Sequence, residues 1–151
     1  IDWNNEENTL KKVLAHPYVA GGTDGSALDL NSENLPPLVH PRHIGTIPRL
    51  LGTYVREQGL LTWEEAIRKL TTLPADILGL KDRGALVKGY LADIVVFDPD
   101  LIQDMSTFED PFHYPTGMRY VIVNGTAVVD EGKYTGALPG RALRGPAYII
   151  K

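Results

Sequence analysis

The sequence predicts an α+β fold, with helical segments in the first part of the chain and β-strands in the second. Up to about Leu80, apolar residues recur at helical spacing. After that point the chain changes to short β-branched runs separated by turn residues, and Asn124-Gly125 is a strong hairpin signal. We therefore expect two architectural parts, residues 1–80 and 81–151. The predicted strands are Leu91 to Phe97, Tyr120 to Val123 and Ala127 to Val129.

Two helices are predicted before Gly59. The first runs from about Glu6 to Ala15. The second runs from Thr46 to Gln58, because Thr46 can cap it, Pro48 suits its first turn and Gly59 can end it. The apolar stripe of the second helix is formed by Leu50, Leu51, Tyr54 and Val55.

A third helix begins at Thr62, which has the capping-box spacing with Glu65. Pro74 is expected to end this helix and to start a short successor that Gly79 closes. The residues expected to pack beneath it are Leu61, Ala66, Ile67 and Leu70.

Between the first two helices, the sequence predicts a strand, an acidic residue and a long loop. Tyr18 to Gly22 is apolar, small and uncharged, as parallel strands buried on both faces are. Asp24 follows it directly. Residues 26–45 contain three prolines and few periodic apolar residues, so we expect an exposed loop. Loops of this length are often lids or binding segments.

Composition excludes several classes of function. The chain has 151 residues, of which 43% are hydrophobic and 23% charged, and its net charge is −4. This charge gives no basic footprint for nucleic acid or an anionic membrane, and no apolar run is long enough to span a bilayer. The absence of cysteine excludes disulfides and thiolate zinc ligands within these residues. Because the chain begins at Ile1 rather than Met, we expect it to be cut, processed or excerpted from a longer protein, so that a targeting segment could lie upstream. Separately, we expect that protein to be cytoplasmic.

A series of motifs carries a resemblance to a known family. The motifs are HPRHIGTIPRLLGTYVREQGLLTWEEAIRKLTTLPADILGLKDRGALVKGYLADIVVFDPDLI, then TFEDP, YVIVNG and GALPGRALRG. In this order they resemble the C-terminal third of the N-acyl-D-amino-acid deacylases, which belong to the amidohydrolase superfamily. The resemblance covers roughly Leu14 to Gly145. The portion from LPADILGL through ADIVVFDP alone would indicate only the wider superfamily.

The resemblance implies a (β/α)8 barrel followed by a small antiparallel β-sandwich. Residues 1–80 would hold the last barrel strand, Tyr18 to Gly22, and its helices, and residues 81–151 would be the C-terminal share of the sandwich. Barrel enzymes place their sites at the carboxyl ends of the strands. By resemblance, Asp24 would be the catalytic aspartate that touches the metal and moves a proton from metal-bound water to the leaving nitrogen.

The chemistry explains why these residue types are needed. Zinc lowers the pKa of bound water to about 7 and polarises the scissile carbonyl, and a nearby carboxylate can shuttle the proton. Arg42, in His40-Pro41-Arg42, matches the family's arginine and suits the substrate's α-carboxylate, because a guanidinium binds a carboxylate through two parallel hydrogen bonds. From the residues alone, a plain Asp-Gly turn at Asp24 and a solvated loop arginine at Arg42 stay open.

The four histidines are better explained as structural or surface residues than as metal ligands. His40 and His43 are close in sequence, but zinc needs further ligands and Pro41 prevents a shared helical face. His16 precedes the expected strand, and His113 lies in a proline-containing loop. The glycines have no phosphate-binding spacing, so we expect no nucleotide site.

The function predicted for the parent protein is zinc-dependent hydrolysis of a linear amide, releasing a D-amino acid and a carboxylate from an N-acyl-D-amino acid. Alternatives are a cyclic-amide hydrolase of the dihydropyrimidinase or hydantoinase type, and a dipeptidase. A third alternative is a non-catalytic module that caps a barrel or oligomerises. Zinc is expected in the full-length parent, and little or none on these residues alone. Their apolar faces would contact the rest of the barrel or a second copy.

Overall fold

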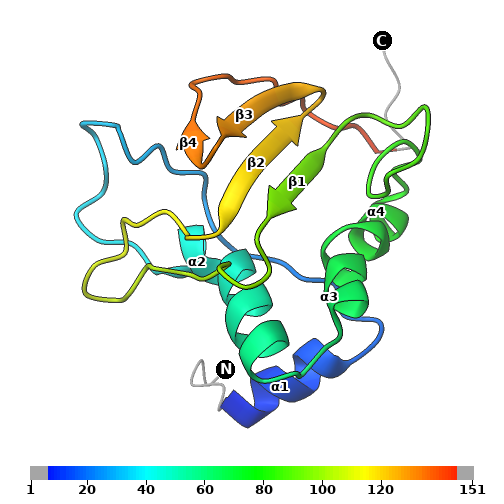
Figure 1. Cartoon of the computed structure of the whole chain (residues 1–151), viewed down its shortest axis with the longest axis horizontal. Helices are drawn as coiled ribbons and strands as arrows, with labels where there is room; N and C mark the ends of the chain where they lie inside the picture. Colours follow the sequence, from blue (N-terminus) through cyan, green and yellow to red (C-terminus); the bar gives the residue numbers. More distant parts are fainter. Residues whose placement is uncertain (1–6, 146–151) are drawn as a thin grey trace.

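In the computed structural model, which describes residues 7–145, helices pack beside one antiparallel sheet (Figure 1). The predicted α+β fold is confirmed. None of the helices in these residues is long and apolar enough to cross a bilayer. The elements in chain order are α1 (Glu7–Ala15), α2 (Arg42–Arg49), the π-helix η1 (Leu50–Glu57), α3 (Trp63–Leu70), α4 (Thr72–Leu78), β1 (Ile94–Phe97), β2 (Met118–Val123), β3 (Thr126–Asp130) and β4 (Lys133–Tyr134).

The first helix agrees with the prediction, but the strand expected after it is absent. α1 covers Glu7–Ala15, whereas Tyr18 to Gly22 forms no strand. A strand needs a hydrogen-bonded neighbour along its length. The amide of Gly21 donates to the Lys69 carbonyl at 2.9 Å, but the sheet of the described residues is built from other segments. The segment is therefore bound to α3 instead of to a sheet.

The second helix begins four residues earlier than predicted. α2 starts at Arg42 after Pro41, whose φ of −53° and ψ of −24° are already helical. Thr46 is an interior residue, not the cap, and its hydroxyl donates to the Arg42 carbonyl at 2.9 Å. Hydroxyl groups make such bonds back to the preceding turn inside helices. The long loop therefore ends before α2, and Arg42 lies on a helix.

The helix continues from Leu50 as η1, a π-helix where an α-helix was expected. Its end shows the wider spacing, because the Gln58 amide donates to the Thr53 carbonyl five residues back, at 3.0 Å. The predicted stop at Gly59 is confirmed by its φ of 61°. The predicted apolar stripe is also confirmed. Its residues lie one, three, four or five positions apart, so they share one face of the helix in a π-helix as well as in an α-helix. The buried stripe residues are Leu50, Leu51, Tyr54 and Val55.

The predicted cap of α3 is confirmed, but the burial predicted for one residue of this helix is wrong. The Thr62 hydroxyl accepts the Glu65 amide hydrogen bond at 3.2 Å. Ala66 is buried, but Ile67 is 37 % exposed, because it lies away from the packed face. α3 ends at Leu70, and α4 contains Pro74 near its start. Gly79 closes α4 in the left-handed region, with a φ of 70°, as predicted.

Replacing Thr62 with alanine should lower the free energy of unfolding by about 1 kcal/mol, because the Glu65 amide loses its capping acceptor. The measurement is urea unfolding of the natural-length protein, compared with Thr62→Ser. The serine variant keeps the hydroxyl and should stay within about 0.5 kcal/mol of the wild type. Equal losses in both variants would argue against the cap.

The sheet is an antiparallel meander with the order β1-β2-β3-β4. β1 pairs with β2 through Ile94 opposite Ile122, and β2 pairs with β3 through Val123 opposite Thr126. The predicted hairpin is confirmed by the φ angles of Asn124 and Gly125, 48° and 80°, which suit a type I′ turn. β4 was not predicted. It follows a second turn of the same kind, in which glutamate stands where asparagine or aspartate usually signals a hairpin.

The main core lies between the helices and the segment that leaves β1. Ile102 is fully buried in the cluster formed by η1 and α3, and Phe97 and Met118 pack against it. Arg56 of η1 donates to the Ile102 carbonyl at 2.6 Å and to Gln103 Oε1 at 2.8 Å. Helices and sheet module thus share one core within the described residues.

Candidate active site

Asp24 and Arg42, the two predicted site residues, are in direct contact although they lie 18 positions apart. Arg42 Nη2 lies 3.0 Å from Asp24 Oδ2, and Arg42 Nε donates to the Asp24 carbonyl oxygen at 3.1 Å. The Asp24 side chain is 83 % exposed and that of Arg42 is 41 % exposed. Ion pairs this exposed contribute little to stability. The contact therefore orients both groups at the surface without fixing either firmly.

The backbone around Asp24 approaches the start of α2 closely. Asp24 has a φ of 48°, in the left-handed region. At Gly25, a Cβ atom would lie 2.9 Å from the His43 Cα and 3.3 Å from the Arg42 carbonyl oxygen. Only glycine fits such an approach without a shift of the backbone. Gly25 is thus required for the loop to pass this close to α2.

His43 supports this loop through its ring. Its Nδ1 accepts a hydrogen bond from the Ser26 amide at 2.7 Å, across 17 positions of sequence. The sequence indicated an ordinary structural or surface histidine and gave no hint of this partner, because the contact exists only once the loop folds back. His43 is structural, as expected, and what it supports is the candidate site.

His40 supports Arg42 in the same way. Its Nδ1 accepts the Arg42 amide hydrogen bond at 3.0 Å, and its ring meets Phe108 edge to face with 4.9 Å between centroids. Burial, followed by the charges of Arg42 and His43, lowers the pKa of His40 below its ordinary value. The ring is therefore neutral at pH 7, which is the form whose Nδ1 can accept this hydrogen bond.

A metal ion would find few ligands in this part of the molecule. Among residues 7–145, no group of three His, Asp or Glu side chains converges on one point. Zinc needs about four ligands, with at least three from protein at catalytic sites. Asp24 is an exposed carboxylate that can supply one of them. The described residues thus offer a carboxylate at Asp24 but hold no group of three such side chains that could bind a metal ion by themselves.

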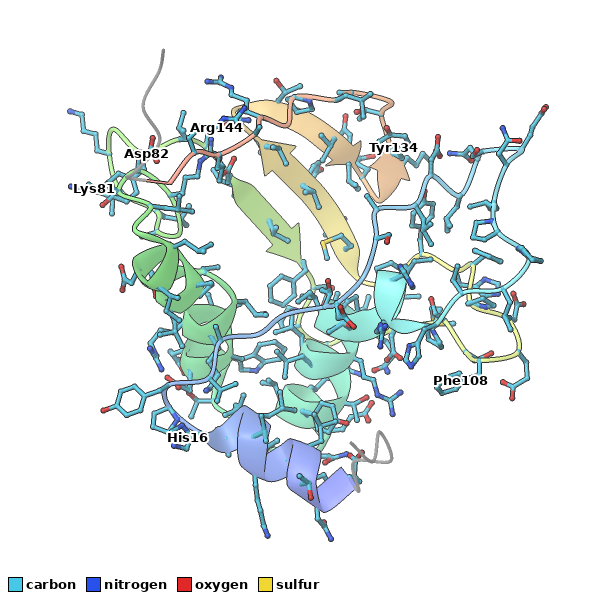
Figure 2. All side chains as sticks on the ribbon, turned by 180° about the vertical axis from the view of Figure 1, so that it is seen from behind. His16, Lys81, Asp82, Phe108, Tyr134 and Arg144 are labelled. Atoms are coloured by element: carbon cyan, nitrogen blue, oxygen red, sulfur yellow. The ribbon has the colours of Figure 1, made fainter. Side chains whose placement is uncertain are left out.

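A cleft of about 890 Å³ is lined by Arg42, by other residues of α1 and α2, and by the loop that contains Phe108. Phe108 is labelled in Figure 2. The cleft has apolar and polar walls, and ligand sites typically combine the two. Several side chains near the candidate site line it: His40, Arg42, Thr46, Asp104, Ser106 and Phe108. Arg42 thus contacts Asp24 and also faces this cleft.

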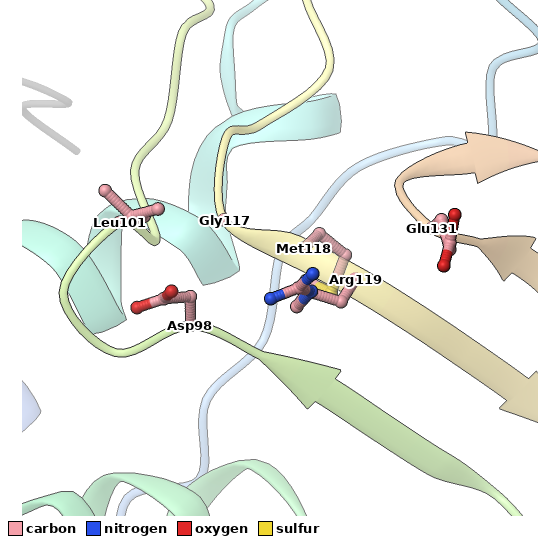
Figure 3. A pocket seen from close by; sticks show the side chains of 6 residues that line it. All are labelled: Asp98, Leu101, Gly117, Met118, Arg119 and Glu131. Atoms are coloured by element: carbon pink, nitrogen blue, oxygen red, sulfur yellow. The ribbon is translucent and has the colours of Figure 1, made fainter.

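A second hollow, of about 430 Å³, lies at one end of the sheet (Figure 3). Its six lining residues include none of the predicted site residues. They are Asp98, Leu101, Gly117, Met118, Arg119 and Glu131. Asp24 and Arg42 therefore lie outside this hollow.

Residues 9–129 match the family model described as "Amidohydrolase family". The chain belongs to the amidohydrolase family. Over 144 residues this amidohydrolase chain is 41% identical to the N-acyl-D-glutamate deacylase of Alcaligenes xylosoxydans xylosoxydans. The alignment covers 95% of this chain and 28% of the relative. The resemblance found in the motifs is thereby confirmed.

Solved structures agree with the sequence relatives. A crystal structure of D-aminoacylase superposes with a TM-score of 0.78 at 40% identity, covering 87% of this amidohydrolase chain and 26% of that protein. The N-acyl-D-glutamate deacylase of Bordetella bronchiseptica, complexed with zinc and a phosphonate mimic of the tetrahedral intermediate, gives 0.73 at 40% identity, with 82% and 24% covered. The chain spans about a quarter of the length of these relatives.

Proposed function

We propose that this chain is the C-terminal part of a zinc-dependent amidohydrolase that converts an N-acyl-D-amino acid into a D-amino acid and a carboxylate. The contact between Asp24 and Arg42 carries the proposal, because it joins a proton carrier and a carboxylate-binding group at one point. The relatives support the substrate class, since those described above act on N-acyl-D-glutamate or are named D-aminoacylase.

The rest of a (β/α)8 barrel would complete the structure. Residues 1–80 would supply the last strand and its helices, and residues 81–151 part of the sandwich. Tyr18 to Gly22 would become the eighth strand once neighbouring strands supply hydrogen-bond partners for those of its backbone groups that α3 does not bind. Tyr18, 81 % exposed here, would then have protein to pack against.

Asp24 and Arg42 would have different roles, proton transfer and substrate binding. When bound, zinc supplies an activated water and a polarised carbonyl. The Arg42 guanidinium would bind the substrate's α-carboxylate through two hydrogen bonds and orient the amide. Asp24 Oδ2 would take a proton and deliver it to the leaving nitrogen. Because the ion pair between the two side chains is exposed, a substrate carboxylate can replace Asp24 on the guanidinium at little cost.

A substrate panel tests the proposal on the natural-length protein, whose intact mass should be well above the 16.6 kDa of these residues. We expect hydrolysis of N-acetyl-D-methionine, with the L-enantiomer, hydantoin, dihydrouracil and a dipeptide as comparisons. The D-substrate should be preferred by at least about 100-fold in kcat/KM, because a misoriented amide loses the alignment that orientation provides. Preference for a cyclic amide or a dipeptide would favour the corresponding alternative. No turnover, with an intact mass of 16.6 kDa, would favour a non-catalytic module.

A further inference from the structure

Lys69 of α3 is a buried cation that the chemistry proposed above does not use. The residue is only 2 % exposed, and a buried ammonium is costly unless hydrogen bonds replace its water. Its Nζ donates to the main-chain carbonyl oxygens of His16 and Val19, the latter at 3.0 Å. It also lies 3.8 Å from Glu65 Oε1. The ammonium is therefore committed to the segment that follows α1.

Two more contacts bind the same segment to α3. Arg68 Nη2 donates to the Pro17 carbonyl oxygen at 2.6 Å, and the Gly21 amide donates to the Lys69 carbonyl at 2.9 Å. His16, which is labelled in Figure 2, lies just past the end of α1. Carbonyl groups at the end of a helix favour cations. Two neighbouring cations of α3 thus bind three carbonyl groups of this segment, those of His16, Pro17 and Val19.

Glu65 balances these cations. Its carboxylate oxygens accept hydrogen bonds from Arg68 at 2.8 and 2.9 Å. These hydrogen bonds, with the charges of Arg68 and Lys69, hold the pKa of Glu65 below its ordinary value. The carboxylate is therefore ionised at neutral pH, and it keeps both cations oriented toward the segment.

The approach at Gly21 is close. A Cβ atom there would lie 2.6 Å from Leu70 Cδ2, so the segment packs directly against α3 and a larger residue would require the Leu70 side chain to move. Asp24 follows Gly21 by three positions and is bound on its other side by Arg42 of α2. The candidate acid thus lies shortly after a segment that α3 fixes, and before the start of α2.

We propose that Lys69 is a positioning residue for Asp24. The proposal rests on the proposed function, because it assigns Lys69 a role in the reaction through Asp24. A buried charge is seldom the most stable choice, since an apolar side chain of similar volume often serves stability equally well. What Lys69 provides in addition is a fixed place for two carbonyl groups. That fixes the path of the chain toward Asp24, and small misplacements of catalytic groups are costly.

The test compares Lys69→Met with Lys81→Met, a matched change at an exposed lysine, in the natural-length protein. Hydrogen exchange of the amides in residues 16–24 should become at least about tenfold faster in Lys69→Met, because local opening becomes easier. In the same variant kcat for N-acetyl-D-methionine should fall about 10- to 100-fold, while KM changes less than about threefold. Lys81→Met should leave the exchange and both kinetic constants unchanged.

Each outcome decides a different point. Unchanged exchange in Lys69→Met would overturn the tether, and faster exchange with unchanged kcat would overturn the positioning role. If Lys69→Met does not fold, Arg68→Met removes the bond to the Pro17 carbonyl from a more exposed side chain. It should then show faster exchange at residues 16–19 and a smaller fall in kcat, and no change in either would overturn the proposal. If the wild type hydrolyses nothing, the proposed function fails, and the exchange measurement still tests the tether.

Discussion

Asp24→Asn in the natural-length protein should lower kcat for N-acetyl-D-methionine by about 10³-fold, within the range that general acid–base catalysis contributes. The amide has nearly the same size as the carboxylate and can still accept a hydrogen bond from Arg42, whose Nη2 lies 3.0 Å from Asp24 Oδ2. What it cannot do is take up a proton and release it to the leaving nitrogen. KM should therefore change little, because a loss confined to the transition state appears in kcat.

Asp29→Asn is the matched control for this change. Asp29 is an exposed acid of the same loop, and its Oδ1 accepts the Asn31 amide hydrogen bond at 3.0 Å, which an asparagine oxygen can also do. Full activity in Asp29→Asn together with a large loss in Asp24→Asn would place the effect at one carboxylate. An Asp24→Asn protein with near wild-type kcat would mean that the Asp-Gly dipeptide serves only as a turn.

The helices and the first hairpin could be predicted because their signals are local. The Thr62 cap needs only an acceptor three residues before an amide, and the Asn124-Gly125 turn needs only residues that tolerate positive φ. Both agree with the structure. The start of α2 was misplaced because Thr46 satisfies the same local rule as a cap, while its hydroxyl in fact bonds back to the Arg42 carbonyl.

The missing strand has a different cause. Tyr18 to Gly22 has the composition of a buried parallel strand, but strand formation depends on neighbours that composition cannot report. In the described residues this segment is bound to α3 through Lys69 and the Gly21 amide. Lys69 itself illustrates the limit, because a lysine within an amphipathic helix is normally solvated.

The site could be predicted only in part. The resemblance supplied the identities of Asp24 and Arg42, and the structure adds that they touch. The roles of His40 and His43 had no sequence signal, because each accepts a backbone amide near the site through a ring nitrogen. The bond from the Ser26 amide to His43 joins the two ends of the long loop. A contact between residues so far apart in sequence leaves no local pattern.

Arg42→Ala should raise KM for N-acetyl-D-methionine by about 10²- to 10³-fold, the equivalent of two charge-assisted hydrogen bonds to a carboxylate. Arg42→Lys should recover only part of this loss, because an ammonium keeps the charge but lacks the planar fork. Arg119→Ala, at an exposed arginine of β2 that lines the other hollow, controls for loss of positive charge and should leave KM unchanged.

A substrate without the carboxylate decides what Arg42 binds. N-acetyl-3-methylthiopropylamine keeps the amide and the methionine side chain but has no α-carboxylate. If Arg42 is the anchor, the wild type should turn this compound over poorly, and Arg42→Ala should lose little further activity on it. An equal loss on both substrates would mean that Arg42 acts through its contact with Asp24, which includes the 3.1 Å hydrogen bond to the Asp24 carbonyl oxygen. The guanidinium would then be a support for the acid, and the basis for expecting an α-carboxylate in the substrate would be lost.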